Sequence, residues 1–262
     1  MLDRIVAAKQ ADMNISGSAI MDEFARADVL PAIREFTASL GNNHPISLIA
    51  EVKKASPSKG LFLADFDPVG LAKTYQTNGA GAVSVITEEN FFLGNPRSLS
   101  NIKKEIELPL LRKDFIIDER QIYESRLLEA DAVLLIARLL PGRLLPMVEL
   151  AQSLGMEPLV ETHNRDELKQ ALDTPVRLIG INNRNLHDFS VNIEVCLDLI
   201  AMVPKDIYCI AESGIFSPQD MMVLEKHGFS GALVGEALVT AVDIGAKVNE
   251  LANYRSGYND ED

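Results

Sequence analysis

The sequence predicts an α/β protein built as a closed (β/α)8 TIM barrel with an N-terminal helical extension. From Ile46 onward, short apolar runs alternate with longer amphipathic segments nearly to the end of the chain. Short runs of this kind are typical of parallel strands that are buried on both faces. Eight strand–helix repeats fit within the 262 residues, which is the count and size of such a barrel. We expect one barrel domain over 1–262, of which 1–44 is the extension.

Residues 1–40 contain no strand-like run and are predicted to be helical. Segments 2–9 and 21–26 place apolar residues at helical spacing. The Ser-Gly-Ser triplet at 16–18 lies between them, and such clusters often end a helix. We therefore expect two helical segments with a break at this triplet.

Each expected strand is a short apolar run that leads into a polar loop. The eight strands are expected at 47–53, 82–87, 110–113, 132–136, 157–161, 177–182, 207–211 and 231–234.

A helix is expected after each strand. Pro68 suits the first turn of a helix because its missing N–H has no partner to lose there. Asp118 and Asn164 have side chains that commonly cap helix N-termini. Besides the helix that Asn164 would cap, the helices are expected at 68–78, 96–106, 118–128, 141–154, 193–202, 217–227 and 243–251.

An open, doubly wound sheet is the competing architecture. Such a sheet more usually has fewer strands and a glycine-rich turn after the first one. The loop at 56–60, Ser-Pro-Ser-Lys-Gly, fits no dinucleotide-binding fingerprint. The closed barrel is therefore favoured.

The composition excludes several classes of function. The formal charge of −13 disfavours a general binder of nucleic acid or of anionic membranes, because phosphate affinity depends on Lys and Arg. The apolar run 132–137 stops at Arg138, far short of a membrane span, and no signal-peptide pattern is present. Cys196 and Cys209 show no metal or redox spacing and are interpreted as ordinary thiols. We expect a soluble, cytoplasmic protein.

Polar side chains gather at the ends of the predicted strands. In a strand, alternate residues share a face, so Glu51 and Lys53 would point the same way. A solvated loop charge is the more common role for any one such residue. For the strand-end residues taken together, a solvated role is less favoured, because burying a charge at the end of an apolar strand is costly unless the charge is paired. The other strand ends carry Lys113, Glu161, Asn182, Arg184, Glu212 and Ser213.

Two glycine-containing segments, 211–214 and 234–236, follow the last two strands. In this fold these loops frequently bind phosphate through backbone N–H groups, although a glycine there is more often only a turn. Phe91, Phe92 and Phe115 follow the second and third strands and could form an aromatic wall for a ring, with core packing as the default role.

The remaining candidates give weaker signals. The histidines show no ligand spacing, and no carboxylate cluster near them completes a site, so no metal is expected. For His163 a loop role is favoured over a place in the mouth. Ser56 has no evident histidine partner and is a poor candidate nucleophile, and Lys54 and Lys59 are expected in solvent. The four histidines are His44, His163, His187 and His227.

Four runs together resemble the indole-3-glycerol phosphate synthase family. The resemblance extends from the first residues to the last helix, over nearly the whole chain. It implies a (β/α)8 barrel that closes and decarboxylates 1-(2-carboxyphenylamino)-1-deoxyribulose 5-phosphate to indole-3-glycerol phosphate, in tryptophan biosynthesis and without a cofactor. The runs are 49–60 (IAEVKKASPSKG), 111–118 (LRKDFIID), 180–186 (GINNRNL) and 211–215 (AESGI).

The resemblance also implies roles for single residues. Lys113 would be the general acid of ring closure, Glu161 the general base, and Lys53 a second proton donor oriented by Glu51. The family often has Ser where Ala237 stands, so one phosphate-binding hydroxyl is expected to be absent. Substrate would be bound by Ser56, Phe92, Phe115, Leu134, Asn182, Arg184, Glu212, Ser213, Gly214, Leu233, Gly235 and Glu236.

Two other readings stay open. An isomerase of phosphorylated amino-sugars would share the barrel and phosphate site, but it favours Asp or Cys at the first strand end, where Glu51 and Lys53 stand. A non-catalytic barrel would only bind a phosphorylated ligand and regulate a partner. The sequence shows no partner motif, so a phosphorylated small molecule is the expected partner and a monomer is compatible with it.

Overall fold

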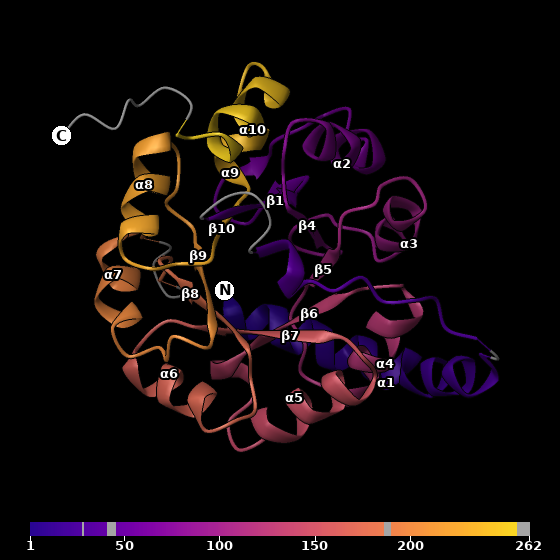
Figure 1. Cartoon of the computed structure of the whole chain (residues 1–262). Helices are drawn as coiled ribbons and strands as arrows, with labels where there is room; N and C mark the ends of the chain where they lie inside the picture. Colours follow the sequence, from indigo (N-terminus) through magenta and orange to yellow (C-terminus); the bar gives the residue numbers. More distant parts are fainter. Residues whose placement is uncertain (28, 41–45, 186–189, 256–262) are drawn as a thin grey trace.

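A computed structural model describes residues 1–27, 29–40, 46–185 and 190–255. Within these ranges eight parallel strands close into a barrel, and β1 pairs with β10 on one side and with β4 on the other. The predicted barrel is confirmed (Figure 1). The barrel strands are β1 (Ser47–Val52), β4 (Ala82–Ile86), β5 (Leu110–Lys113), β6 (Ala132–Ile136), β7 (Glu157–Thr162), β8 (Leu178–Asn182), β9 (Tyr208–Glu212) and β10 (Gly231–Val234).

Helices form a ring around the barrel (Figure 1). Two predicted N-caps are confirmed: Asp118 accepts a hydrogen bond from Arg120 N, and Asn164 accepts from the N–H groups of Asp166 and Glu167. The helices are α2 (Pro68–Thr77), α3 (Arg97–Lys103), α4 (Glu119–Leu127), α5 (Leu144–Ser153), α6 (Arg165–Leu172), α7 (Glu194–Ile200), α8 (Pro218–Lys226), α9 (Glu236–Val239) and α10 (Ile244–Ala252), with 3-10 turns η1 (Thr37–Leu40) and η2 (Ala137–Leu139).

The predicted break in the N-terminal region is wrong, because one helix, α1 (Leu2–Arg26), runs through 16–18. The buried residues of α1 recur every three or four positions and form one stripe. Gly17 belongs to this stripe and lies against α4, where a Cβ atom would overlap the guanidinium of Arg120. The glycine therefore permits close packing of two helices. The buried residues are Ile5, Lys9, Met13, Gly17 and Ile20.

The predicted extension reaches residue 44, but 41–44 lie outside the described residues. Thr37–Leu40 form η1, and Phe36 and Leu40 join the apolar cluster inside the barrel. No helix in the described ranges is long and apolar enough to span a membrane.

Side-chain alternation along the strands determines what enters the barrel. In β6, Leu134 belongs to the interior cluster, whereas Val133 and Leu135 belong to the layer between strands and helices. Ile49, Leu111, Leu159 and Ile210 are also interior residues. Two positions further along their strands come Glu51, Lys113, Glu161 and Glu212, which by the same alternation point into the C-terminal mouth.

Candidate active site

A cavity opens at the C-terminal mouth of the barrel. Its lining includes every site residue predicted from the sequence except Ser56 and Phe91. Ser56 lies in a small hairpin of β2 (Ala55–Ser56) and β3 (Gly60–Leu61), where its hydroxyl accepts a hydrogen bond from Lys59 N at 3.2 Å. The lining residues predicted from the sequence are Glu51, Lys53, Phe92, Lys113, Phe115, Leu134, Glu161, Asn182, Arg184, Glu212, Ser213, Gly214, Leu233, Gly235 and Glu236.

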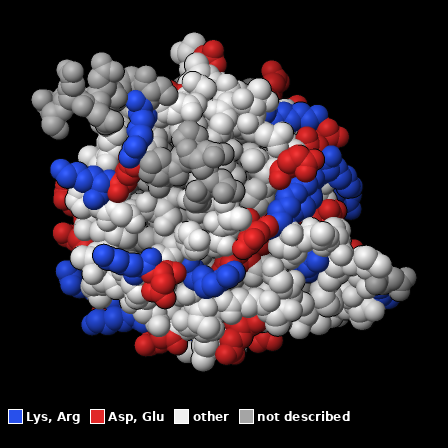
Figure 2. Space-filling model, in the orientation of Figure 1, with Lys and Arg blue, Asp and Glu red and all other residues white. Residues whose placement is uncertain are grey.

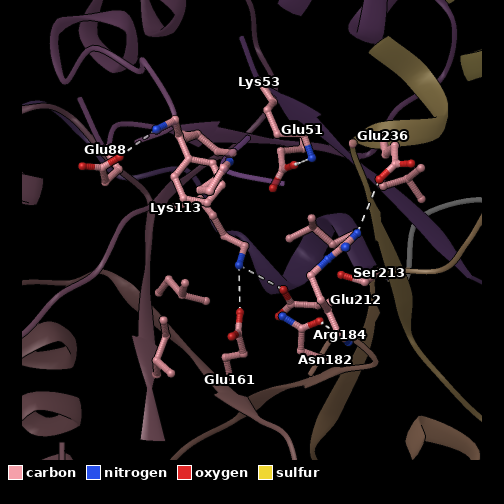
Figure 3. Close-up of a pocket in the computed structure, with 18 of the residues that line it drawn as sticks. Glu51, Lys53, Glu88, Lys113, Glu161, Asn182, Arg184, Glu212, Ser213 and Glu236 are labelled. Atoms are coloured by element: carbon pink, nitrogen blue, oxygen red, sulfur yellow. Dashed lines mark hydrogen bonds and ion pairs between the residues drawn. The ribbon is translucent and has the colours of Figure 1, made fainter. Parts of the chain in front are cut away.

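Lys113 is the central cation of this cavity (Figure 3). Its Nζ lies 2.8 Å from Oε2 of Glu161 and 3.2 Å from Oε2 of Glu212. Burial acts to lower the pKa of Lys113, but the charges of Glu161 and Glu212 raise it above its ordinary value. Lys113 is therefore an ammonium at neutral pH, with a proton to donate.

The two carboxyl groups around Lys113 differ in protonation. Burial raises the pKa of Glu212 to about 8, against the opposing charge of Lys113. Burial also acts to raise the pKa of Glu161, but Lys113 and His163 hold it well below its usual range. At neutral pH Glu161 is therefore ionised and Glu212 protonated, a division that suits acid–base chemistry.

Glu51 and Lys53 form a second pair at the end of β1, with Oε2 and Nζ 2.8 Å apart. This is the common face expected from their spacing. Lys53 Nζ also lies 5.5 Å from the ring centroid of Phe62. At Gly235, in the loop after β10, a Cβ atom would overlap the Glu51 carboxylate and lie 3.0 Å from Lys53 Nζ. Glycine at this position leaves space for the pair.

The loops after the last three strands supply polar groups on another side of the mouth. Ser213 and Gly214 have φ angles of 65° and 79°, in the left-handed region that a serine seldom adopts. Asn183 Nδ2 donates to Ser213 O at 3.0 Å and fixes this turn. Both residues line the cavity, so this turn brings backbone atoms to the wall of the mouth.

Glu236 connects two loops across the mouth. Its carboxylate lies 3.4 Å from a guanidinium nitrogen of Arg184 and also pairs with Lys59 of the hairpin. Lys59, expected in solvent, is half exposed and has this partner. The loop after β1 is thereby attached to the loop after β10.

The expected aromatic wall consists of Phe92 and Phe115, whose ring centroids lie 6.0 Å apart. Phe91 instead lies under Arg4 of α1, 5.8 Å from its guanidinium carbon. Leu134 and Leu233 line the same cavity from inside the barrel. These apolar surfaces suit an aromatic ring.

Glu88 lines the cavity but was missed in the sequence reasoning. Its buried carboxylate accepts hydrogen bonds from the N–H groups of Asn90, Phe91 and Phe92 at 3.0, 2.7 and 2.8 Å. These bonds shape the loop that carries Phe92. Glu88 directly follows the expected strand 82–87. It would have been found if the polar residue at the end of this strand had been considered, as it was for other strands.

The N-terminal end of α1 also borders the cavity, with Met1, Leu2 and Ile5 in its lining. In Figure 1 this end lies over the centre of the barrel. Sequence reasoning missed these residues, because nothing in their local pattern says where a terminal helix will pack.

Of the four histidines, the structure describes two, His163 after β7 and His227 at the end of α8. His163 lies in the loop after β7 and not in the cavity lining, as expected, but its side chain is only 6% exposed and lies behind Glu161. His227 is exposed, and its Nδ1 lies 2.7 Å from Val223 O. His44 and His187 lie outside the described residues, as does Leu186 of the 180–186 run.

The surface around the mouth carries both signs of charge. On the face shown in Figure 2, Lys and Arg side chains lie beside Asp and Glu side chains around the rim. Such a mixed surface differs from the continuous basic stripe with which proteins bind nucleic-acid backbones.

Comparisons with known proteins agree with this geometry. The family model described as "Indole-3-glycerol phosphate synthase" matches residues 2–251. The indole-3-glycerol phosphate synthase of Desulforamulus reducens is 52% identical over 224 residues, covering 85% of this chain and 84% of that protein. The enzyme of the same name from Roseiflexus sp. is 45% identical over 262 residues, covering 96% and 97%. That of Chloroherpeton thalassium is 48% identical over 226 residues, covering 85% and 87%.

Proposed function

The chain belongs to the indole-3-glycerol phosphate synthase family of decarboxylating carbon–carbon lyases, and on this premise we propose how its barrel mouth performs the reaction. The proposed substrate is 1-(2-carboxyphenylamino)-1-deoxyribulose 5-phosphate, which is closed, decarboxylated and dehydrated to indole-3-glycerol phosphate. The observation that carries the proposal is the ammonium of Lys113 held between Glu161 and Glu212 beside an aromatic wall.

Lys113 is the proposed general acid of ring closure. When a ring carbon attacks the substrate ketone, negative charge develops on the ketone oxygen and requires a proton. A positioned ammonium supplies the proton and stabilises the charge before transfer is complete. The raised pKa of Lys113 supports this role, because the group enters the reaction protonated.

Glu161 is the proposed general base. Loss of carbon dioxide restores the aromaticity that ring closure interrupts. Dehydration then needs one group to take a proton and another to protonate the departing hydroxyl. Glu161 is ionised and can accept, whereas Lys53, held by Glu51 at 2.8 Å, is the proposed second donor.

The substrate's two ends are proposed to occupy opposite sides of the cavity. The ring would lie against Phe92, Phe115, Leu134 and Leu233. The phosphate would lie near Gly214, with Arg184 and Asn182 contacting the polar groups between. Ala237 lines the cavity and has no hydroxyl, so backbone N–H groups are proposed to bind the phosphate there. The proposed phosphate side also includes Ser56, Ser213 and Gly235.

We further propose that the enzyme acts in the cytoplasm, as a monomer and without a cofactor. Cys196 and Cys209 support the reducing compartment, since both are free, buried thiols. Burial raises the pKa of the Cys196 thiol to about 11, which keeps it unreactive at neutral pH.

The test is to incubate the purified protein with the substrate in the presence of EDTA and to follow indole fluorescence with time. A rise in fluorescence that is unaffected by EDTA is the expected result. Binding without turnover, seen by calorimetry, would instead support a regulatory barrel. Neither binding nor turnover would point to other phosphorylated substrates, including those of an amino-sugar isomerase.

A further inference from the structure

His163 lies directly behind the proposed base, just after the end of β7. Its Nε2 is 3.2 Å from Oε1 of Glu161, the carboxylate oxygen that does not contact Lys113. Its Nδ1 is 2.9 Å from Oε2 of Glu167, in the first turn of α6. The imidazole therefore bridges the carboxylate of the mouth and a carboxylate outside it.

Glu167 is itself fixed, so the imidazole has little freedom to rotate. Its Oε2 also accepts a hydrogen bond from the backbone N–H of His163 at 2.9 Å. Its Oε1 accepts from Asn164 Nδ2 at 2.7 Å and from Arg138 Nε at 3.0 Å. Nδ1 of His163 is thus held by a carboxylate that accepts three further hydrogen bonds.

The groups around His163 alternate in charge. The chain runs outward from Lys113 through Glu161, His163 and Glu167 to Arg138. These residues are carried by β5, β7 and the loop after it, α6 and η2. Glu212 of β9 contacts Lys113 as well. Arg184, after β8, lines a side cavity together with His163.

In this surrounding His163 is cationic at neutral pH. Burial acts to lower its pKa, but Glu161 and Glu167 raise it to about 9. A cation behind Glu161 favours the ionised carboxylate, and its attraction for Oε1 at 3.2 Å favours the orientation in which Oε2 faces Lys113.

We propose that His163 is a positioning residue, whose imidazolium, braced by Glu167, keeps the Glu161 carboxylate ionised and oriented toward the substrate. The inference rests on the proposed function, because it assigns His163 to the base of that reaction. His163 is not expected to touch a reacting atom, because Glu161 lies between it and Lys113. A purely structural role, in which the ring only anchors the start of α6, is the alternative.

The variant His163→Gln separates charge from shape, since the glutamine amide can donate a hydrogen bond to Glu161 but cannot be cationic. We expect kcat at pH 7.5 to fall about tenfold, with little change in KM, because Glu161 stays ionised but loses the cation that orients its Oε2 toward Lys113. In the wild type, His163 deprotonates near pH 9, and its effect on kcat should then disappear. We therefore expect the kcat values of the wild type and the variant to become equal above pH 10. A ratio that is constant across pH would overturn the proposal and leave the structural role.

A second readout does not depend on turnover. In protein labelled with [δ-13C]glutamate, the Glu161 signal is assigned by its loss in Glu161→Gln and then titrated by NMR. We expect its midpoint to move upward by about one pH unit in His163→Gln. An unchanged midpoint would refute the inference, even if the enzyme were active. A wild type that makes no indole product would refute the proposed function, and the titration would still report whether His163 acts on Glu161.

Two further variants complete the test. Glu167→Gln keeps the imidazole but removes one of the charges that raise the pKa of His163. The fall of kcat at alkaline pH should therefore begin at a lower pH than in the wild type. This variant also covers the case in which His163→Gln fails to fold. His227→Gln is the matched control, because His227 is exposed and distant from the chain of charges, and its profile should equal that of the wild type. A shift in the control equal to that of His163→Gln would contradict the proposal.

Discussion

Lys9 Nζ lies 2.7 Å from Oδ1 of Asp114, so helix α1 is ion-paired to the residue directly after Lys113. Both side chains are buried, and Asp114 also contacts Arg112 at 3.1 Å and accepts a hydrogen bond from Thr87 Oγ1 at 2.7 Å. The N-terminal helix is therefore part of the support of the catalytic mouth.

Replacing Lys9 by Met should destabilise the protein. Asp114 keeps Arg112 and Thr87, so the expected loss is about 1.5–3 kcal/mol, the range for a hydrogen bond to a charged group, and less than for a fully isolated buried charge. Urea unfolding measures the change. Arg26→Met is the control, because its pair with Asp22 is exposed and should contribute less than about 1 kcal/mol. Equal losses in the two variants would contradict a special role for the Lys9 pair.

Replacing Lys113 by Met should abolish ring closure while leaving substrate binding largely intact. The variant removes the proposed acid, which contributes about 100-fold to 10,000-fold in rate. Indole fluorescence measures turnover and calorimetry measures binding. Lys169→Met changes an exposed lysine of α6 and should leave both values unaltered. Near-normal turnover in the Lys113 variant would refute the assigned role.

Replacing Glu212 by Gln should stabilise the fold at alkaline pH. The folded-state pKa of about 8 lies above the ordinary value of 4.5, so the folded state keeps a proton that the unfolded state releases. This group therefore makes the free energy of unfolding fall as pH rises from about 4.5 to 8. Glutamine resembles the protonated form and removes this fall, so we expect a gain on the order of 4 kcal/mol at pH 8 and little below pH 5.

Denaturant unfolding at several pH values checks this prediction. Glu149→Gln, at an exposed position of α5, is the matched control and should change stability by less than about 0.5 kcal/mol at every pH. A gain for Glu212→Gln that is independent of pH would count against a protonated Glu212.

Replacing Gly235 by Ala should lower turnover without unfolding the protein. The added methyl group would overlap the Glu51 carboxylate and press on Lys53, so the pair must move out of the mouth. We expect at least a tenfold loss of kcat, because displacement of a catalytic group by about 1 Å is that costly. Gly142→Ala provides the contrast: Gly142 has a φ of 70° and open space around it, so the change should cost about 1 kcal/mol of stability and no activity. Unaltered turnover in Gly235→Ala would refute the steric argument.

Much of this molecule could be predicted from local pattern. Short apolar runs identify every barrel strand to within one residue at each end, and period-two alternation along those strands directs Lys113 and Glu161 into the mouth. Their roles came from the family resemblance, and they remain proposals. Pattern succeeds here because a strand's side-chain direction depends only on its own residues.

The contacts that could not be predicted join segments far apart in the sequence. Gly17 has the local appearance of a helix break, and only Arg120 of α4 explains why it lies inside one. His163 is a loop residue, as its pattern predicts, but only its contacts with Glu161 and Glu167 show that its ring is buried between two carboxylates. Packing partners of this kind follow from the tertiary fold, which single-residue preferences do not encode.

Closure of the barrel through β1 has a consequence for how the protein is made. Because β1 pairs with both β4 and β10, a nascent chain synthesised only as far as residue 230 contains every barrel strand but the last. Its sheet still has two open edges, at β1 and β9, which could pair with other chains. Pairing of the four residues Gly231–Val234 with β1 and β9 satisfies both edges at once, so protection from aggregation arrives only with this last barrel strand.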